Sequence, residues 1–119
     1  MDVRNLDDVP PFITKDGSEI RELMHPAQQG NRLQSFAEAT VQPGMGTALH
    51  RHGATEEIYH ITQGQGRMTL GAERFDVFRG DTICITPGTP HCIENTGREA
   101  LKILCACVPA YSHDDTELL

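Results

Sequence analysis

The sequence predicts an all-β fold, built as one small antiparallel barrel. Eleven glycines and seven prolines divide the 119 residues into short segments. These segments are rich in Val, Ile and Thr, which favour strands. No long stretch shows the apolar periodicity of an amphipathic helix. Short, regularly spaced strands with turn residues between them are typical of sandwiches and barrels, and the length suits a single domain over residues 1–119.

Nine short strands are expected in order along the chain. They cover Glu19–Leu23, Arg32–Val41, Thr47–His52, Glu57–Gln63, Gly66–Leu70, Glu73–Val77, Asp81–Thr86, His91–Asn95 and Ala100–Val108. The core of the barrel then spans residues 32–108, with a strand extension over 1–31 and a tail over 109–119. The tail contains SHDDTE, a pattern typical of a capped helix start, which predicts a short helix over Ser112–Leu119.

Turn residues set the limits of these strands. The first strand follows Asp16-Gly17, a pair that suits a tight hairpin. The second strand ends at Pro43-Gly44, the third is followed by Gly53, and the fourth ends at Gly64. Further turn signals separate the remaining strands: Leu70-Gly71, Arg79-Gly80-Asp81, Pro87-Gly88 and Asn95-Thr96-Gly97.

Alternation assigns the inward faces, because successive side chains of a strand point to opposite sides. In the last strand Lys102 should face water, so its neighbours should face inward: Leu101, Ile103, Cys105 and Cys107. In the second strand, one face carries the small residues Ser35, Ala37, Ala39 and Val41. We interpret Cys105 and Cys107 as small buried hydrophobes rather than as part of a thiol cluster with Cys84.

The charge balance excludes several classes of partner. Ten Lys and Arg residues against 17 Asp and Glu residues give a net charge of −7. Nucleic acid and anionic membrane surfaces repel such a chain and are not expected as partners. No apolar run approaches the ~18–20 residues of a membrane helix, and the N-terminus lacks the pattern of a signal peptide. The four cysteines are therefore expected to be reduced, in the cytoplasm.

Histidines and glutamates form the most informative pattern. His50 and His52 are two residues apart on an expected strand, so both imidazoles project from one face. Either Glu56 or Glu57, at the start of the next strand, can enter the same space, and His91 follows a proline-glycine turn. Three imidazole nitrogens and one carboxylate oxygen suit one divalent transition metal, namely Mn, Fe, Ni, Zn, Co or Cu.

These stretches resemble the two sequence motifs of the cupin superfamily, over about residues 32–108. The first motif, G-x5-H-x-H-x3–4-E-x6-G, is matched by Gly44, His50, His52, Glu57 and Gly64. Glu57 is preferred to Glu56 because only Glu57 has the six-residue spacing to Gly64. The second motif, G-x5-P-x-G-x2-H-x3-N, is matched by Gly80, Gly88, His91 and Asn95. The chain departs from it at Thr86, where the family usually has proline.

The resemblance implies a jelly-roll barrel with a metal near one mouth. The implied ligands are His50, His52, Glu57 and His91. Four protein ligands would leave two adjacent positions of a six-coordinate ion for a small-molecule ligand or substrate. Tyr59 shares the face of Glu57 and is a candidate catalytic proton or hydrogen-bond donor, with a buried structural tyrosine as the alternative. The remaining histidines are not expected to be ligands: His25, His60 and His113.

The ligand set and the resemblance together predict a metal-dependent enzyme on a small oxygenated substrate, such as a sugar derivative, keto acid or dicarboxylate. Isomerase or lyase chemistry and dioxygenase or decarboxylase chemistry both remain open. The alternative is a non-catalytic metal-containing module that binds or senses a small molecule or carbohydrate. A homodimer is expected, because the N-terminal extension could cover a sheet edge of a second subunit and because small cupins commonly form dimers.

Overall fold

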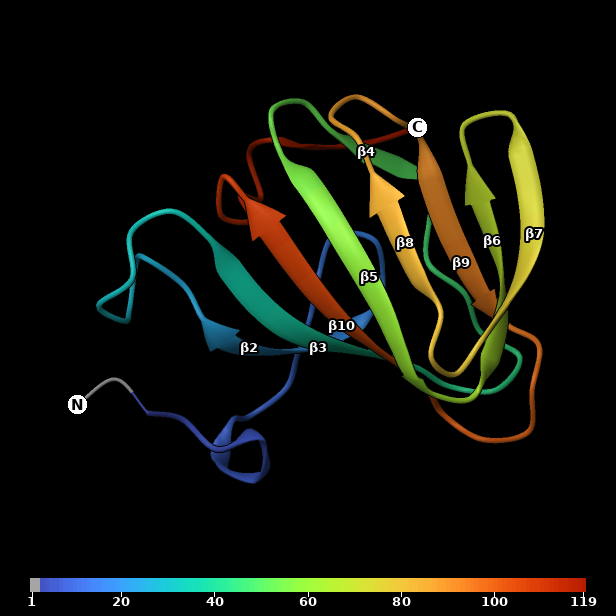
Figure 1. The fold of residues 1–119 in the computed structure, drawn as a ribbon, viewed down its shortest axis with the longest axis horizontal. Helices are drawn as coiled ribbons and strands as arrows, with labels where there is room; N and C mark the ends of the chain where they lie inside the picture. Colours follow the sequence, from blue (N-terminus) through green and yellow to red (C-terminus); the bar gives the residue numbers. More distant parts are fainter. Residues whose placement is uncertain (1–2) are drawn as a thin grey trace.

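The computed structural model describes residues 3–119 and shows a jelly-roll barrel of two antiparallel sheets (Figure 1). The first sheet contains, in spatial order, β1 (Phe12–Ile13), β2 (Glu19–Met24), β3 (Ser35–Val41), β10 (Leu101–Val108), β5 (Glu56–Gln63) and β8 (Thr82–Ile85). The second contains β11 (Thr116–Leu118), β4 (His50–His52), β9 (His91–Asn95), β6 (Gln65–Leu70) and β7 (Glu73–Phe78). The all-β fold class is confirmed. Residues 1–2 of the expected domain lie outside the described residues.

Aliphatic side chains from both sheets fill the interior. Ile61, Met68 and Leu101 have no exposed surface, and Ile103 is 1% exposed. Burying each such side chain contributes roughly 1.5–3 kcal/mol. Burial alternates along β10 as the sequence predicts, since Leu101, Ile103, Cys105 and Cys107 are buried while the residues between them are less so. The barrel therefore has an interior made mainly of Ile, Leu, Val and Met.

Most expected strands are present, with shifted ends. The second expected strand begins at Ser35 rather than Arg32, and the third contains only His50–His52. Before β4, Gly46 makes an isolated bridge to Glu94, so the chain there touches β9 without forming a continuous strand. Within residues 3–119 the one regular helical segment is a 3-10 turn at Leu6–Asp8, and no helix in this range is long and apolar enough to cross a membrane.

The helix expected over Ser112–Leu119 is wrong. Its capping pattern forms a single turn, in which Asp115 donates a backbone hydrogen bond to Ser112. The chain then continues as β11, and Thr116 pairs with His52 across to β4. An eight-residue helix is marginal in water because nucleation is costly. Without the tail, β4 would be the edge strand of its sheet, and pairing with β11 satisfies the backbone groups of that edge.

The Asp16-Gly17 turn is present and closes the β1–β2 hairpin. Gly17 has φ +92°, a conformation that favours glycine. The hairpin is also tied to other parts of the chain. The backbone N–H of Ala48 donates to the Asp16 carbonyl at 2.7 Å, and Lys15 Nζ donates to the Thr116 carbonyl at 2.7 Å. The hairpin tip thus lies where β4 and β11 meet.

Candidate metal centre

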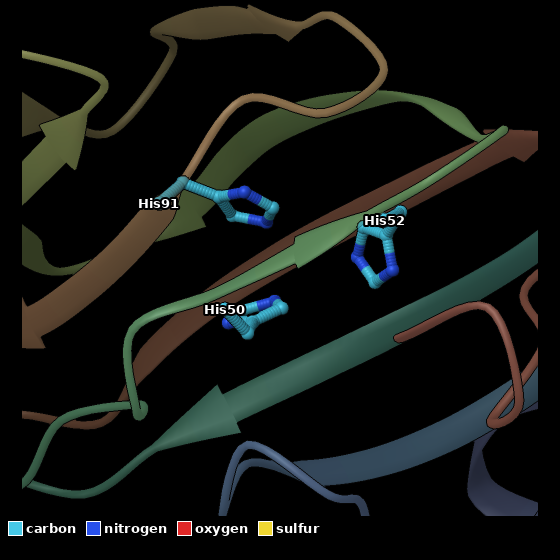
Figure 2. Close-up of side chains that lie close together, drawn as sticks. All are labelled: His50, His52 and His91. Carbon is cyan, nitrogen blue, oxygen red and sulfur yellow. The ribbon is translucent and has the colours of Figure 1, made fainter. Parts of the chain in front are cut away.

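Three buried histidines meet inside the barrel (Figure 2). His50 and His52 project from the same face of β4, and His91 at the start of β9 is the cross-strand partner of His50. None of the three is more than 4% exposed. One nitrogen from each ring lies within 4.8 Å of the other two. The strand pairing therefore brings together residues that are about forty positions apart in the sequence.

Hydrogen bonds at Nδ1 orient two of these rings. His50 Nδ1 lies 2.7 Å from the carbonyl oxygen of Ala48, and His91 Nδ1 lies 2.9 Å from that of Thr89. A carbonyl oxygen can only accept, so each Nδ1 carries the proton. In the neutral imidazole, Nε2 then has a free lone pair. Both rings are thus held in the form that can bind a cation through Nε2.

The tail strand orients the third ring. His52 Nδ1 lies 3.0 Å from the hydroxyl oxygen of Thr116 on β11. That hydroxyl donates its own proton to the Ser112 carbonyl at 2.9 Å, so it accepts from His52. Nε2 of His52 is left as the acceptor. All three imidazoles therefore have the same tautomer.

Glu57 on β5 faces the cluster. Its Oε1 lies 3.3 Å from His52 Nε2 and 3.5 Å from His91 Nε2. Burial raises the pKa of Glu57, whereas His52 and His91 lower it to about 2 when their Nε2 atoms carry protons; a cation held between these groups would act in the same direction. Oε2 accepts a hydrogen bond from the Cys107 thiol at 3.2 Å. Burial, and then the Glu57 carboxylate, raise the pKa of Cys107, so the thiol keeps its proton and remains a donor.

The donor atoms fit a divalent metal. Glu57 Oε1 and His91 Nε2 are buried and have no hydrogen-bond partner among the residues that the structure describes. Buried polar atoms without partners are costly, and a cation between them would satisfy both. Adjacent donors on an octahedral ion with bonds of about 2.1 Å lie about 3.0 Å apart, close to the 3.3 Å and 3.5 Å separations found here.

Small and aliphatic side chains line the cavity next to the cluster. The small face of β3 is turned inward as predicted, and the apolar walls include Ile20, Ala37, Ala39, Val41, Ile93 and Ile103. Tyr59 is also in this wall, with its ring centroid 6.1 Å from that of His91. Burial, and next Glu57, raise the pKa of Tyr59, so its hydroxyl is a donor at neutral pH.

Other predicted residues lie outside the cluster. Glu56 is exposed on the opposite face of β5 from Glu57. His25 Nε2 lies 2.8 Å from the Tyr111 carbonyl, and the other two histidines outside the cluster are at the surface or partly buried. Cys84 is exposed, so it does not approach the two buried cysteines of β10. The turn at Thr86 forms without the usual proline, because its carbonyl accepts from the Thr89 N–H.

Three residues near the cluster were not identified from the sequence. Asp16 Oδ2 lies 3.5 Å from His50 Nε2, Thr116 orients His52, and Cys107 contacts Glu57. The sequence marks Asp16 only as a turn residue and Cys107 only as an inward residue. The partner of Thr116 depends on how β11 pairs with β4, which the sequence does not indicate.

Comparisons with known proteins agree with the fold described above. The family described as "Cupin domain" matches residues 37–107. An uncharacterized protein of Methanocaldococcus jannaschii, MJ1618, is 57% identical over 113 residues, which cover 95% of this chain and 90% of that protein. An oxalate-binding protein of Thermotoga maritima is 30% identical over 90 residues, covering 76% of this chain and 74% of that protein.

Among solved structures, a predicted oxalate decarboxylase from Thermotoga maritima superposes with a TM-score of 0.79 at 29% identity, covering 92% of this chain and 99% of that chain. The two sheets and their connections are thus shared along nearly the whole length of both chains. The family match extends over more than half of the chain's residues, so the chain belongs to the cupin family.

Proposed function

We propose that the chain binds one divalent transition metal through Nε2 of His50, His52 and His91 and through the carboxylate of Glu57. The observation that carries the proposal is the shared tautomer of the three imidazoles, which leaves Nε2 of each ring free, together with the Glu57 carboxylate beside two of these Nε2 atoms. A mixed set of nitrogen and oxygen donors suits Mn, Fe, Co, Ni, Cu and Zn.

The proposed substrate is a small oxygenated acid, with a dicarboxylate such as oxalate first. A relative from Thermotoga maritima is described as an oxalate-binding protein, and a similar solved structure from the same organism is described as a predicted oxalate decarboxylase. Four protein ligands leave two positions of a six-coordinate ion, which suits a bidentate acid. A bound divalent cation would supply Lewis-acid polarisation of the oxygens of that acid. Keto acids and sugar derivatives present similar oxygen pairs.

The chain's own groups support turnover at this site. The apolar walls of β3 and β10 exclude water from one side of the cavity, which strengthens electrostatic interactions there. Tyr59 can donate a hydrogen bond or a proton from its hydroxyl to a bound acid. Binding without turnover is the second candidate, and it is favoured by the description of one relative as a binding protein.

The metal site is tested by His50→Ala and His91→Ala, with His60→Ala as a matched control outside the cluster. Each cluster variant should lose most of its bound metal, measured by elemental analysis, while circular dichroism shows the β fold retained. The control should keep the wild-type stoichiometry. Stoichiometric metal in both cluster variants would refute the assignment.

Catalysis and binding are separated by incubating the metal-loaded protein with oxalate. An enzyme should consume oxalate, Glu57→Ala should abolish turnover, and Tyr59→Phe should reduce turnover with metal content unchanged. A binding module should retain oxalate unchanged after long incubation, as measured by mass spectrometry of the released ligand. Failure to bind oxalate at all would exclude this substrate for both candidates.

We also propose a homodimer formed through the outer face of the first sheet. On this face Phe36 and Ile58 lie on either side of Ala106 on adjacent strands, and both are more than a third exposed. Such an apolar row is typical of an interface between subunits. Ile58→Glu should yield monomers by light scattering coupled to gel filtration, while Leu33→Glu, at an exposed loop residue, should not.

A cytoplasmic location is proposed from the cysteines. All four are free thiols, and two of them are buried in the barrel. Free thiols persist in a reducing compartment. Fractionation of cells that express the chain tests this, and recovery outside the cytoplasm would refute it.

A further inference from the structure

A second carboxylate lies beside the histidine cluster, on a segment with no role in the cluster described so far. Asp16 is in the turn of the β1–β2 hairpin, and its Oδ2 lies 3.5 Å from His50 Nε2. The Asp16 side chain is only 13% exposed, and it lines the same cavity as Glu57. Its distance to His50 equals that of Glu57 Oε1 to His91 Nε2, also 3.5 Å.

Hydrogen bonds fix the orientation of this carboxylate. Oδ1 accepts from the Thr14 hydroxyl at 2.7 Å, from the Ser18 N–H at 2.9 Å and from the Ser18 hydroxyl at 2.7 Å. All three donors of the turn bind Oδ1, and none of them binds Oδ2. Oδ2 faces His50, and the hydrogen bonds of the turn do not explain this orientation of Oδ2.

The hairpin that carries Asp16 is attached to the residues that orient the histidines. The Asp16 carbonyl accepts from the Ala48 N–H, and the Ala48 carbonyl accepts from His50 Nδ1. Lys15 Nζ donates to the carbonyl of Thr116, whose hydroxyl orients His52. Asp16 and the imidazoles therefore keep their relative positions through a short chain of bonds.

We propose that Asp16 Oδ2 is a fifth protein ligand of the metal, on the His50 side of the cluster. The inference rests on the proposed metal site. Asp16 would occupy one of the two positions that the other four ligands leave on a six-coordinate ion. With both carboxylates bound to a divalent ion, the resting site is neutral, whereas without Asp16 it has a net charge of about +1.

The experiment compares Asp16→Asn with the wild type, using Co2+ as the probe. Asparagine keeps an acceptor for the donors of the turn, so the hairpin is retained. Asp16→Ser, which also suits a turn, serves as a second variant, and circular dichroism verifies the fold of both. Asp7→Asn is the matched control, because Asp7 is an exposed aspartate of the same N-terminal segment.

Chelator competition should show Co2+ affinity roughly 10–100-fold lower in both Asp16 variants, the range found for residues that support a metal site. The visible absorption spectrum of bound Co2+ should change in shape and intensity, because the ligand set changes. Affinity within twofold of wild type would overturn the inference. So would weaker binding with an unchanged spectrum, which would mean that Asp16 acts only through its charge.

The same titration separates failure of the inference from failure of the proposed function. Wild-type protein that binds Co2+ no better than His91→Ala has no site of the proposed kind, and both proposals fall. Wild-type protein that binds Co2+ tightly, with Asp16 variants indistinguishable from Asp7→Asn, leaves the four-ligand site standing and removes Asp16 from it.

Discussion

Replacing Thr116 by valine tests how far the tail strand prepares the metal site. Thr116 is 4% exposed, and its hydroxyl is the acceptor that keeps the proton of His52 on Nδ1. Valine has nearly the same shape and favours strands equally well, so β11 should remain paired with β4. The change replaces the hydroxyl by a methyl group, and so removes both the hydrogen bond from His52 and the hydrogen bond to the Ser112 carbonyl.

The expected loss of metal affinity follows from the hydrogen bond to His52. Metal binding needs the lone pair of His52 Nε2, which leaves the proton on Nδ1 facing the methyl group of the new valine. A buried donor without a partner costs ~1–3 kcal/mol, which corresponds to about 5- to 140-fold in affinity. This agrees with the roughly 10–100-fold loss typical of groups that hold a metal-binding histidine.

Chelator competition with Co2+ measures this effect, and Thr116→Ser is the matched control because it restores the hydroxyl. The serine variant should bind Co2+ nearly as well as the wild type. Equal affinities for the valine and serine variants would show that Thr116 does not control the tautomer of His52. Melting of both metal-free variants verifies that β11 still pairs with β4.

Three other predictions follow from the same contacts. Cys107→Ala removes the donor to Glu57 Oε2 and should lower Co2+ affinity several-fold, whereas Cys107→Ser should preserve it. Burial, and next a neighbouring imidazole, lower the pKa of His50 below its ordinary 6.5. The unfolded chain therefore takes up a proton that the folded chain does not, so the metal-free protein should lose stability in urea as the pH falls below 6.5, a trend that a constant urea midpoint would contradict. Gly66→Ala would place a Cβ 2.6 Å from a backbone carbonyl oxygen of β9, and should destabilise the barrel by ~1–3 kcal/mol in denaturant titrations.

The sequence predicts those parts of the fold that depend on local rules. Alternation in β10 and β3 places the right residues inside, because the two-residue period of a strand does not depend on its partners. The i, i+2 spacing of His50 and His52 places both on one face for the same reason. Turn residues also locate most strand ends, including the hairpin turn at Asp16-Gly17.

The remaining features depend on which strands pair and in what register. Cys107 contacts Glu57 because these two residues are cross-strand partners of β10 and β5, a match that neither segment specifies alone. The helix predicted for the tail was wrong for a similar reason. Its capping residues form the expected first turn, but pairing with β4 outweighs a weak local preference, and Thr116 then comes opposite His52.

The residues at the site come from two parts of the chain, the family segment and the segments that flank it. The segment matched by the family, residues 37–107, contains all four proposed ligands. Asp16 and Thr116 lie outside it, on the hairpin before and the strand after. Lys15 bonds to the backbone of the tail at Thr116, so these flanking segments hold each other as well as the histidines. The four proposed ligands therefore come from the family segment, while the proposed fifth ligand and the hydrogen bond that orients His52 come from the flanking hairpin and tail.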